Sequence, residues 1–527
     1  MRRLAGDYAY DFDRLSRFFA GNPADPSAWP AAVARVQAHP RQRERVVDAL
    51  REQQDRRAAP PEARAAAARL GDPRTVAIVT GQQAGLFGGP VYTLLKALTA
   101  LQLAAKVNHD HGVPTVAIFW IEAEDHDWAE VSSCAVLDAE MRRQTLTLGT
   151  PYGAGEGPVA SVRLDPAIFA AIETLRFTLP GTEFTDEVLE RLGGAYRPGV
   201  GMADAFGQWL ETILGPLGLV VYDAADPATK PLVRDVFLRE LESPGVTTRL
   251  ATESGDALVD LGYHAQVVPH RDNVALFRLE GIRQTIHFRD QDFVVGERPV
   301  PAERLLEEAR LRPEGFSPNV LLRPIVQDTL FPTICYVAGP NELAYLAQLK
   351  PIYERFGLPA PLMYPRATAT LLDSASARFL AKYDIPLETM QPGDEAALNH
   401  LLEAQLPKAV EEALHDATRA TDTSMHRLIE AVPSIDPTLE DAARSSLGRM
   451  QHQLRTLHDK IIHAAKRRDE TLRRQYGRTR ALAFPDGHPQ ERSVAFVYFL
   501  NRYGPALVDR LYAELPLGLG QHWVITI

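Results

Sequence analysis

Residues 76–127 read VAIVTGQQAGLFGGPVYTLLKALTALQLAAKVNHDHGVPTVAIFWIEAEDHD, and this stretch decides the fold of the chain. The apolar run 76–79 is typical of a strand buried on both faces, and a glycine-rich loop follows it. Apolar residues then recur at helical spacing from Val91 to Ala105. A second apolar run, 115–121, ends in an acidic cluster. The order predicts a βαβ unit, and open parallel sheets bind ligands at the carboxyl ends of their strands.

The glycine loop between the first strand and the helix is a candidate anion site. Gly85, Gly88 and Gly89 leave backbone N–H groups accessible at a helix start, where the helix dipole favours a phosphate or carboxylate. Gln82 and Gln83 add amide donors and acceptors toward a polar ligand. The spacing matches neither the dinucleotide fingerprint nor the P-loop. A tight turn that only packs helix against strand is therefore the alternative interpretation.

Two polar residues of the helix lie off its apolar face. Tyr92 and Lys96 share one stripe, and Lys96 is less than two turns from the helix start. Its charge is placed to reinforce an anion site at the loop, although a solvated lysine fits the same pattern.

The acidic cluster at the end of the second strand surrounds one histidine. Carboxylates beside a histidine fix its tautomer and favour its charged form, which suits a general base. We therefore predict that His126 is the base, that Asp125 or Asp127 orients it, and that Glu124 lies beside the substrate. Neighbouring ligands on one short segment seldom reach a single ion, so we predict no metal site. A solvated loop is the alternative.

A second strand–Gly-Pro–helix unit occupies residues 332–356. Asn341 and Glu342 open its helix, and the segment before its strand carries Arg323, Gln327 and Asp328. Two such units fit two halves of one α/β sheet that face a common cleft, so we expect these five residues near the cleft. Arginine binds a carboxylate through two parallel hydrogen bonds. Each residue taken singly also fits a capping or loop role.

Composition narrows the class of protein. The chain has 527 residues, is 45% hydrophobic and 24% charged, and carries a formal net charge of −11, which argues against non-specific nucleic-acid binding. Its two cysteines form no C-x-x-C motif, which excludes a cysteine-rich zinc site or disulfide framework and fits a reducing cytosol. No signal peptide is visible and no apolar stretch approaches the roughly 20 residues of a membrane span. We expect a cytoplasmic protein without nucleic-acid or membrane partners.

The pattern along the chain predicts four regions. Residues 1–71 form an N-terminal helical segment, and 72–370 form the α/β core with insertions at about 145–200 and 255–315. Residues 371–480 form an antiparallel helical coiled-coil arm, and 481–527 a C-terminal globular segment. Apolar residues from Leu447 to Ala464 follow spacings of three and four, close to a heptad seam. An exposed arm of this kind predicts a homodimer, and an arm packed on its own core is the alternative.

Motifs along nearly the whole chain resemble the bacillithiol-biosynthesis cysteine-adding enzymes, the putative cysteine ligases of the BshC type. The resemblance implies a Rossmann-like core related to class I aminoacyl-tRNA synthetases and nucleotidyl transferases, with two insertions and a coiled-coil arm that dimerises. It also implies a reaction that joins cysteine to the amine of glucosaminyl-malate as an amide. The motifs are VTGQQAGL (79–86), FWIEAEDHD (119–127), LRPIVQD (322–328), YVAGPNE (336–342), QER (490–492) and NRYGP (501–505).

The glycine loop stands where the synthetases bind phosphate, but it lacks their two histidines, and residues 364–368 replace their lysine-rich signature. These departures argue against adenylation of cysteine by the synthetase route, and ATP or another nucleotide stays a candidate co-substrate. Under the ligase hypothesis, Lys96 and the loop glycines hold a phosphate or the malyl carboxylates, while Asn341, Glu342 and the two glutamines orient the substrates. A nucleotidyl transferase of another pathway and a non-catalytic coiled-coil scaffold are the alternatives.

Overall fold

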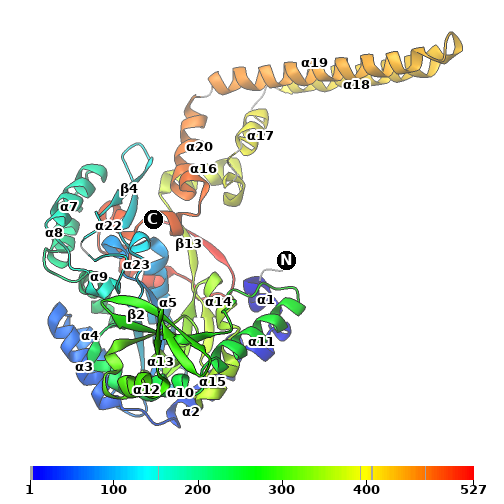
Figure 1. The fold of residues 1–527 in the computed structure, drawn as a ribbon. Helices are drawn as coiled ribbons and strands as arrows, with labels where there is room; N and C mark the ends of the chain where they lie inside the picture. Colours follow the sequence, from blue (N-terminus) through cyan, green and yellow to red (C-terminus); the bar gives the residue numbers. More distant parts are fainter. Residues whose placement is uncertain (1–3, 152, 392, 394, 405–407, 469) are drawn as a thin grey trace. The chain divides into compact units, whose positions relative to one another are not determined.

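The computed structural model describes the chain except for residues 1–3, 152, 392, 394, 405–407 and 469. It divides into two compact units, residues 1–370 with 490–525 and residues 371–489 with 526–527 (Figure 1). None of the helices described combines the length and the apolar character that crossing a bilayer requires.

A five-stranded parallel sheet forms the centre of the first unit, in the order β12-β11-β1-β2-β5. The sequence prediction of a Rossmann-like parallel sheet is confirmed. Each strand is an apolar run buried on both faces, as helices on both sides of a parallel sheet require. The strands are β1 (Val76–Gln83), β2 (Thr115–Glu122), β5 (Val220–Asp223), β11 (Thr333–Ala338) and β12 (Leu362–Pro365).

Helices cover both faces of this sheet. On one face lie α5 (Val91–His111) and α9 (Met202–Leu214), and the rings of Phe119 and Phe206 approach to 6.0 Å between centroids. The other face packs against α10 (Lys230–Glu242) and α13 (Arg323–Leu330) in one apolar core. There the Tyr222 ring lies 4.9 Å from that of Trp120. Both layers hold the strand ends in place.

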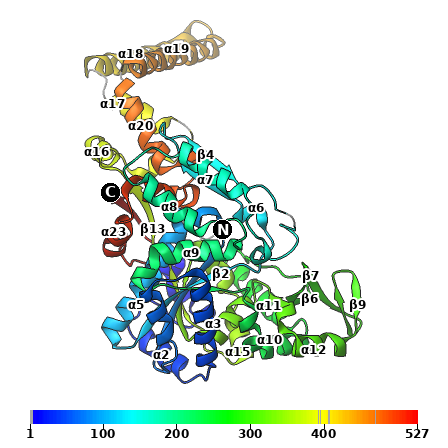
Figure 2. The same ribbon diagram turned by 90° about the vertical axis from the view of Figure 1, so that its left-hand side faces the viewer.

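Four N-terminal helices precede the sheet, and two long connections interrupt it. The connection between β5 and β11 carries an antiparallel sheet in the order β10-β6-β7-β8-β9, with α10 and α11 against β6 (Figure 2). The elements are α1 (Leu4–Tyr10), α2 (Ala28–Gln37), α3 (Arg43–Arg57), α4 (Pro61–Arg69), α6 (Trp128–Val131), β3 (Ser133–Leu137), β4 (Arg143–Thr147), α7 (Ala167–Thr178), α8 (Thr185–Ala195), α11 (Val246–Asp260), β6 (Asn273–Glu280), β7 (Ile282–Arg289), β8 (Asp292–Val295), β9 (Arg298–Val300), α12 (Ala302–Leu311) and β10 (Phe316–Pro318).

The first unit closes with short elements after β11 and near the C-terminus. These are α14 (Pro340–Leu346), α15 (Lys350–Phe356), α21 (Gln490–Ser493), α22 (Phe496–Tyr503), α23 (Leu507–Glu514) and β14 (His522–Thr526), which pairs with β13 (Thr368–Leu372).

The second unit is helical, and its longest elements form a hairpin. Helices α18 (Lys408–Ala431) and α19 (Leu439–Arg468) pack together through a small core of Met425, Ile429, Ala443 and Leu447. This confirms the predicted coiled-coil arm. The other helices are α16 (Ser374–Tyr383), α17 (Ala396–Ala404) and α20 (Glu470–Ala483).

Candidate functional site

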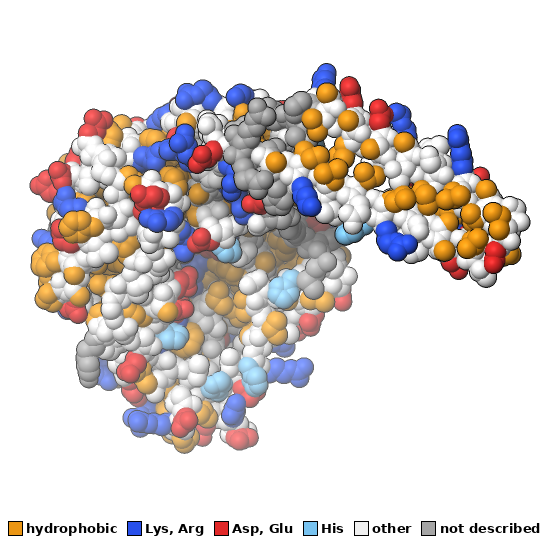
Figure 3. All heavy atoms as spheres, turned by 90° about the horizontal axis from the view of Figure 1, so that it is seen from above, with side chains coloured by type: hydrophobic (Ala, Val, Ile, Leu, Met, Phe, Trp, Pro, Cys, Tyr) orange, Lys and Arg blue, Asp and Glu red, His pale blue; other side chains and the backbone are white. Residues whose placement is uncertain are grey.

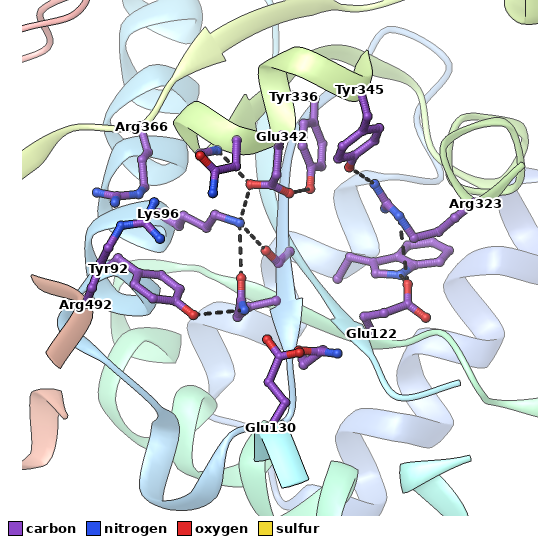
Figure 4. A pocket seen from close by; sticks show the side chains of 16 residues that line it. Tyr92, Lys96, Glu122, Glu130, Arg323, Tyr336, Glu342, Tyr345, Arg366 and Arg492 are labelled. Atoms are coloured by element: carbon purple, nitrogen blue, oxygen red, sulfur yellow. Dashed lines mark hydrogen bonds and ion pairs between the residues drawn. The ribbon is translucent and has the colours of Figure 1, made fainter. Parts of the chain in front are cut away.

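A cavity of about 360 Å³ opens at the carboxyl ends of β1, β2 and β11 (Figure 4). This is the edge at which parallel sheets bind ligands. Seven residues singled out from the sequence line it together: Gln82, Gln83, Tyr92, Lys96, Arg323, Asn341 and Glu342. The rest of the lining is Gly81, Trp120, Glu122, Glu130, Tyr336, Gly339, Tyr345, Arg366 and Arg492.

Lys96 is hydrogen-bonded to several polar groups around the cavity. Its ammonium is 3% exposed, donates to the Gly81 carbonyl at 2.8 Å and to Gln82 Oε1 at 3.2 Å, and pairs with Glu342 Oε2 at 2.6 Å. Gln82 in turn positions Tyr92, because its Nε2 donates to the Tyr92 hydroxyl at 3.1 Å. All three ammonium donors are used within the protein. Lys96 therefore orients the groups that face a ligand.

Glu342 is held as a carboxylate. Its Oε2 accepts from the Gly339 N–H at 2.6 Å and its Oε1 from the Tyr336 hydroxyl at 3.0 Å, in addition to the Lys96 pair. Burial alone raises the pKa of such a group, but the Lys96 charge and these hydrogen bonds outweigh it, so the pKa of Glu342 is lowered. Burial lowers the pKa of Lys96, and Glu342 opposes that shift.

Two guanidinium groups lie at one side of the cavity (Figure 4). Arg366 is 4% exposed, makes two hydrogen bonds with Glu491 at 2.9 and 2.6 Å, and lies 5.5 Å from the centre of the Tyr92 ring. The neighbouring Arg492 makes no ion pair with any residue that the structure describes. Glu491 thus neutralises Arg366, whereas the Arg492 guanidinium keeps a charge at the cavity that no described residue pairs with.

The opposite side of the cavity is aromatic. Arg323 lies over the Tyr336 ring at 5.5 Å and donates to the Tyr345 hydroxyl at 3.2 Å. Its Nε is 3.9 Å from Glu122, whose carboxylate accepts from the Trp120 indole at 3.1 Å. This side offers ring faces and one carboxylate to a ligand.

A second cavity, of about 300 Å³, adjoins the first. The two share Gln82, Gln83, Tyr92, Glu130 and Arg492, so one wall serves both. Gly85, Gly89 and Pro90 of the glycine loop line the second cavity only, together with Thr93, Val131, Ser133, Cys134, Ala135, Arg143, Thr145, Ser493 and Ala495. Burial raises the pKa of Cys134 to about 12, which keeps this thiol protonated and unreactive.

Three residues predicted near the ligand pack inside the protein instead of lining a cavity. Gly88 has φ +95°, and a Cβ there would lie 2.3 Å from the Phe496 ring, so it is a packing glycine. Gln327 and Asp328 are buried, and Asp328 accepts from Gln327 at 2.8 Å and from the Tyr353 hydroxyl at 2.5 Å. These two residues anchor α13 against α15.

In the acidic cluster, His126 faces solvent, whereas Asp125 and Asp127 support the cavity wall. His126 is 53% exposed, with its Nδ1 3.2 Å from Asp125, and lines neither cavity. Asp125 accepts from Gln83 at 2.8 Å and from Arg283 at 3.1 Å. Asp127 caps α6 by accepting from the Glu130 N–H at 3.0 Å. The two aspartates thus support the cavity wall at Gln83 and Glu130.

Glu124 is sealed away from both cavities. It is 2% exposed and forms an ion pair with Lys230, which is 3% exposed at the start of α10. Burial raises the pKa of Glu124 to about 7, and Lys230 offsets only part of that shift.

Arg366, Arg492 and Glu130 are charged lining residues that the sequence reasoning did not propose for the site. Arg366 directly follows β12, so the strand-end rule that found the acidic cluster identifies it too. Arg492 belongs to the QER motif (490–492) that carries the family resemblance, but no local pattern places it at the sheet, because only tertiary folding brings residues 490–492 there. Among the residues described, no group of three or more His, Cys, Asp or Glu side chains is arranged to hold a metal ion.

Comparisons with known proteins agree with this architecture. The family model "Bacillithiol biosynthesis BshC, N-terminal Rossmann-like domain" matches residues 1–367, and the "C-terminal coiled-coil domain" of the same family matches 369–527. A Salinibacter ruber protein named "Putative cysteine ligase BshC" is 32% identical over 99% of this chain and 95% of its own length. Proteins of the same name from Koribacter versatilis and Chlorobaculum tepidum are 33% and 34% identical, over 97% and 89% of this chain and 94% and 86% of theirs. The chain therefore belongs to the BshC family of bacillithiol biosynthesis.

Proposed function

We propose that this protein joins the carboxyl group of cysteine to the amine of glucosaminyl-malate, forming an amide. The observation that carries the proposal is the fixed Arg366 beside the free Arg492 in a cavity that also holds carboxylates. Two guanidinium groups match the two carboxylates of a malyl group. The sugar amine is a cation when protonated, and it matches Glu122 or Glu130.

The cysteine carboxylate needs activation, because its oxygen is a poor leaving group. A nucleoside triphosphate is the co-substrate we propose, since phosphoryl or nucleotidyl transfer to that oxygen turns it into a phosphate leaving group. Gly85 and Gly89 line the second cavity beside the start of α5, where the helix dipole favours an anion. We assign the activated cysteine to this second cavity.

The amine must lose a proton before it attacks. His126, paired with Asp125, is the acceptor predicted from the sequence. The ring lies outside the lining of both cavities, so His126→Ala tests the assignment directly. Full turnover by this variant would remove His126 from the mechanism.

Purified protein incubated with glucosaminyl-malate, cysteine and ATP, with and without Mg²⁺, tests the reaction by mass spectrometry. We expect the cysteinyl amide together with stoichiometric AMP or ADP, and the nucleotide product identifies the activation step. Arg492→Ala should lower kcat/KM about 10- to 100-fold, the worth of a charged hydrogen bond. Arg310→Ala, which removes an exposed arginine of α12, is the matched control. Amide formation by Arg492→Ala at the wild-type rate would contradict the site.

We also propose that the arm pairs two copies of the chain. Leu428, Met450 and Leu457 are 48%, 47% and 49% exposed on α18 and α19, and Figure 3 shows hydrophobic side chains gathered along the arm. Exposed apolar side chains in such a row favour association. Met450→Glu/Leu457→Glu should convert a dimer to a monomer in analytical ultracentrifugation, whereas His452→Glu on the exposed side of α19 should not. A monomeric wild-type protein would contradict this assignment.

A further inference from the structure

The wall shared by the two cavities contains one carboxylate, that of Glu130. In a reaction that joins two substrates, the bond forms where their two compartments meet. Glu130 stands at that junction, on the short helix α6, and Asp127 fixes the start of that helix. Figure 4 shows its side chain directed toward the cavity.

The other carboxylates of the first cavity are already engaged. Glu342 uses both oxygens on Lys96, Gly339 and Tyr336. Glu122 accepts from Trp120, lies near Arg323, and lines the first cavity only. Glu130 makes no ion pair with the residues that the structure describes, so its charge has no cationic partner there.

The surroundings of Glu130 favour a cation beside it. Partial burial raises the pKa of Glu130, Gln83 offsets part of that shift, and Asp127 and Asp125 add to it. A positive group beside the carboxylate stabilises its charged form, which burial and the repulsion from Asp127 and Asp125 both disfavour. Tyr92, whose pKa is raised by burial and by Glu130, lies close by in the same wall.

We propose that Glu130 is the receptor for the reacting amine of the acceptor substrate, held at the wall between the two cavities. The inference rests on the proposed function and assigns one substrate to each compartment. The carboxylates of the amine substrate lie in the first cavity at Arg366 and Arg492, and the carboxyl donor lies in the second. The amine then faces the donor across the shared wall.

Calorimetric binding of glucosaminyl-malate and of its N-acetylated analogue to the full-length protein tests the assignment. Acetylation removes the positive charge and leaves the malyl group unchanged. We expect wild-type protein to prefer the free amine by about 10- to 100-fold, the worth of one charged hydrogen bond. Glu130→Gln should bind both ligands with nearly equal affinity. Glu122→Gln, the same change on the lining of the first cavity alone, should keep the preference.

The outcomes separate the two proposals. A preference for the amine that survives in Glu130→Gln overturns the role of Glu130 and leaves the proposed function standing. Loss of the preference in Glu122→Gln instead would move the receptor to Glu122. Failure of wild-type protein to bind either ligand would contradict the proposed function, and the assignment of Glu130 with it. Glu130 lies outside the packed core, so Glu130→Gln should fold, which unchanged tryptophan emission would verify.

Discussion

Two buried lysine–glutamate pairs stand at the same edge of the central sheet and differ in what lies above them. Lys96 and Glu342 follow the adjacent strands β1 and β11, while Glu124 and Lys230 follow the adjacent strands β2 and β5. Both lysines are 3% exposed. Glu342 is 23% exposed and faces the first cavity, whereas Glu124 is 2% exposed and lines neither cavity.

The surroundings give the two glutamates opposite properties. The pKa of Glu342 is lowered, because Lys96, a backbone N–H and a tyrosine hydroxyl outweigh its burial. The pKa of Glu124 is raised to about 7, because burial outweighs the opposing charges of Lys230 and Arg283. One pair therefore orders the lining of the first cavity, and the other ties two strand ends together.

The largest expected effect is the loss of stability when the buried Glu124–Lys230 pair is broken. At about pH 8, above the raised pKa of Glu124, Lys230→Met leaves the Glu124 charge buried without its partner and should cost about 3–5 kcal/mol of unfolding free energy. Adding Glu124→Leu should recover most of that loss, since an apolar pair of similar volume needs no desolvation. All five tryptophans lie in the first unit, so urea unfolding followed by tryptophan emission reports on this unit. A Lys230→Met variant as stable as wild type would show that the Glu124–Lys230 pair is not buried away from solvent.

The second prediction uses pH to distinguish the pairs. Between about pH 4.5 and 7, folded Glu124 holds a proton that the unfolded chain has lost, so its contribution to stability falls as pH rises, by on the order of 3 kcal/mol. Glu342 has the opposite sign: its contribution is present above the ordinary glutamate pKa and is lost as pH falls through its lowered pKa. Glu124→Gln should remove the first slope and Glu342→Gln the second, in urea midpoints from about pH 3 to 8. Parallel profiles for the two variants would contradict the comparison.

The third prediction concerns the activity lost when the Lys96–Glu342 pair, which lines the first cavity, is broken. Lys96→Met releases Gln82 and Glu342 from their positions and should lower kcat/KM about 100-fold, or roughly 2.7 kcal/mol. Its stability loss should be smaller than that of Lys230→Met, because Glu342 keeps the Gly339 and Tyr336 hydrogen bonds. Steady-state kinetics of the proposed ligation and the same urea experiment give both numbers. A Lys96→Met enzyme with wild-type turnover would remove Lys96 from the site.

The smallest effect is the stabilisation that a bound ligand provides. Glucosaminyl-malate at ten times its Kd should raise the unfolding free energy by about 1.4 kcal/mol. Wild type and Lys230→Met should gain equally, whereas Lys96→Met at the same ligand concentration should gain much less. Thermal denaturation with and without ligand measures the difference. Equal gains in all three proteins would place the ligand elsewhere.

The sequence predicts the strands of the sheet and the edge where polar groups gather, because apolar runs and glycine turns are local signals. It brings Lys96 and Glu342 to a common cleft by the same logic, and the structure places both in one cavity. No local sequence pattern predicts whether Glu124 faces a ligand or a lysine. That depends on Lys230, which lies 106 residues further along the chain. Arg492 reaches the site in the same way, through folding of the C-terminal segment.

The two residues of the Arg366–Glu491 ion pair are synthesised at different times during translation. The two residues are 125 positions apart, and the whole arm is synthesised between them. At roughly 5–20 residues per second, Glu491 leaves the ribosome's catalytic centre about 6–25 s after Arg366. Until then a nascent chain carries a nearly complete sheet whose Arg366 has no counterion from Glu491. The cavity is thus completed only after the arm has been synthesised, and a chain that ends within the arm lacks Glu491, Arg492 and the other C-terminal residues of the first unit.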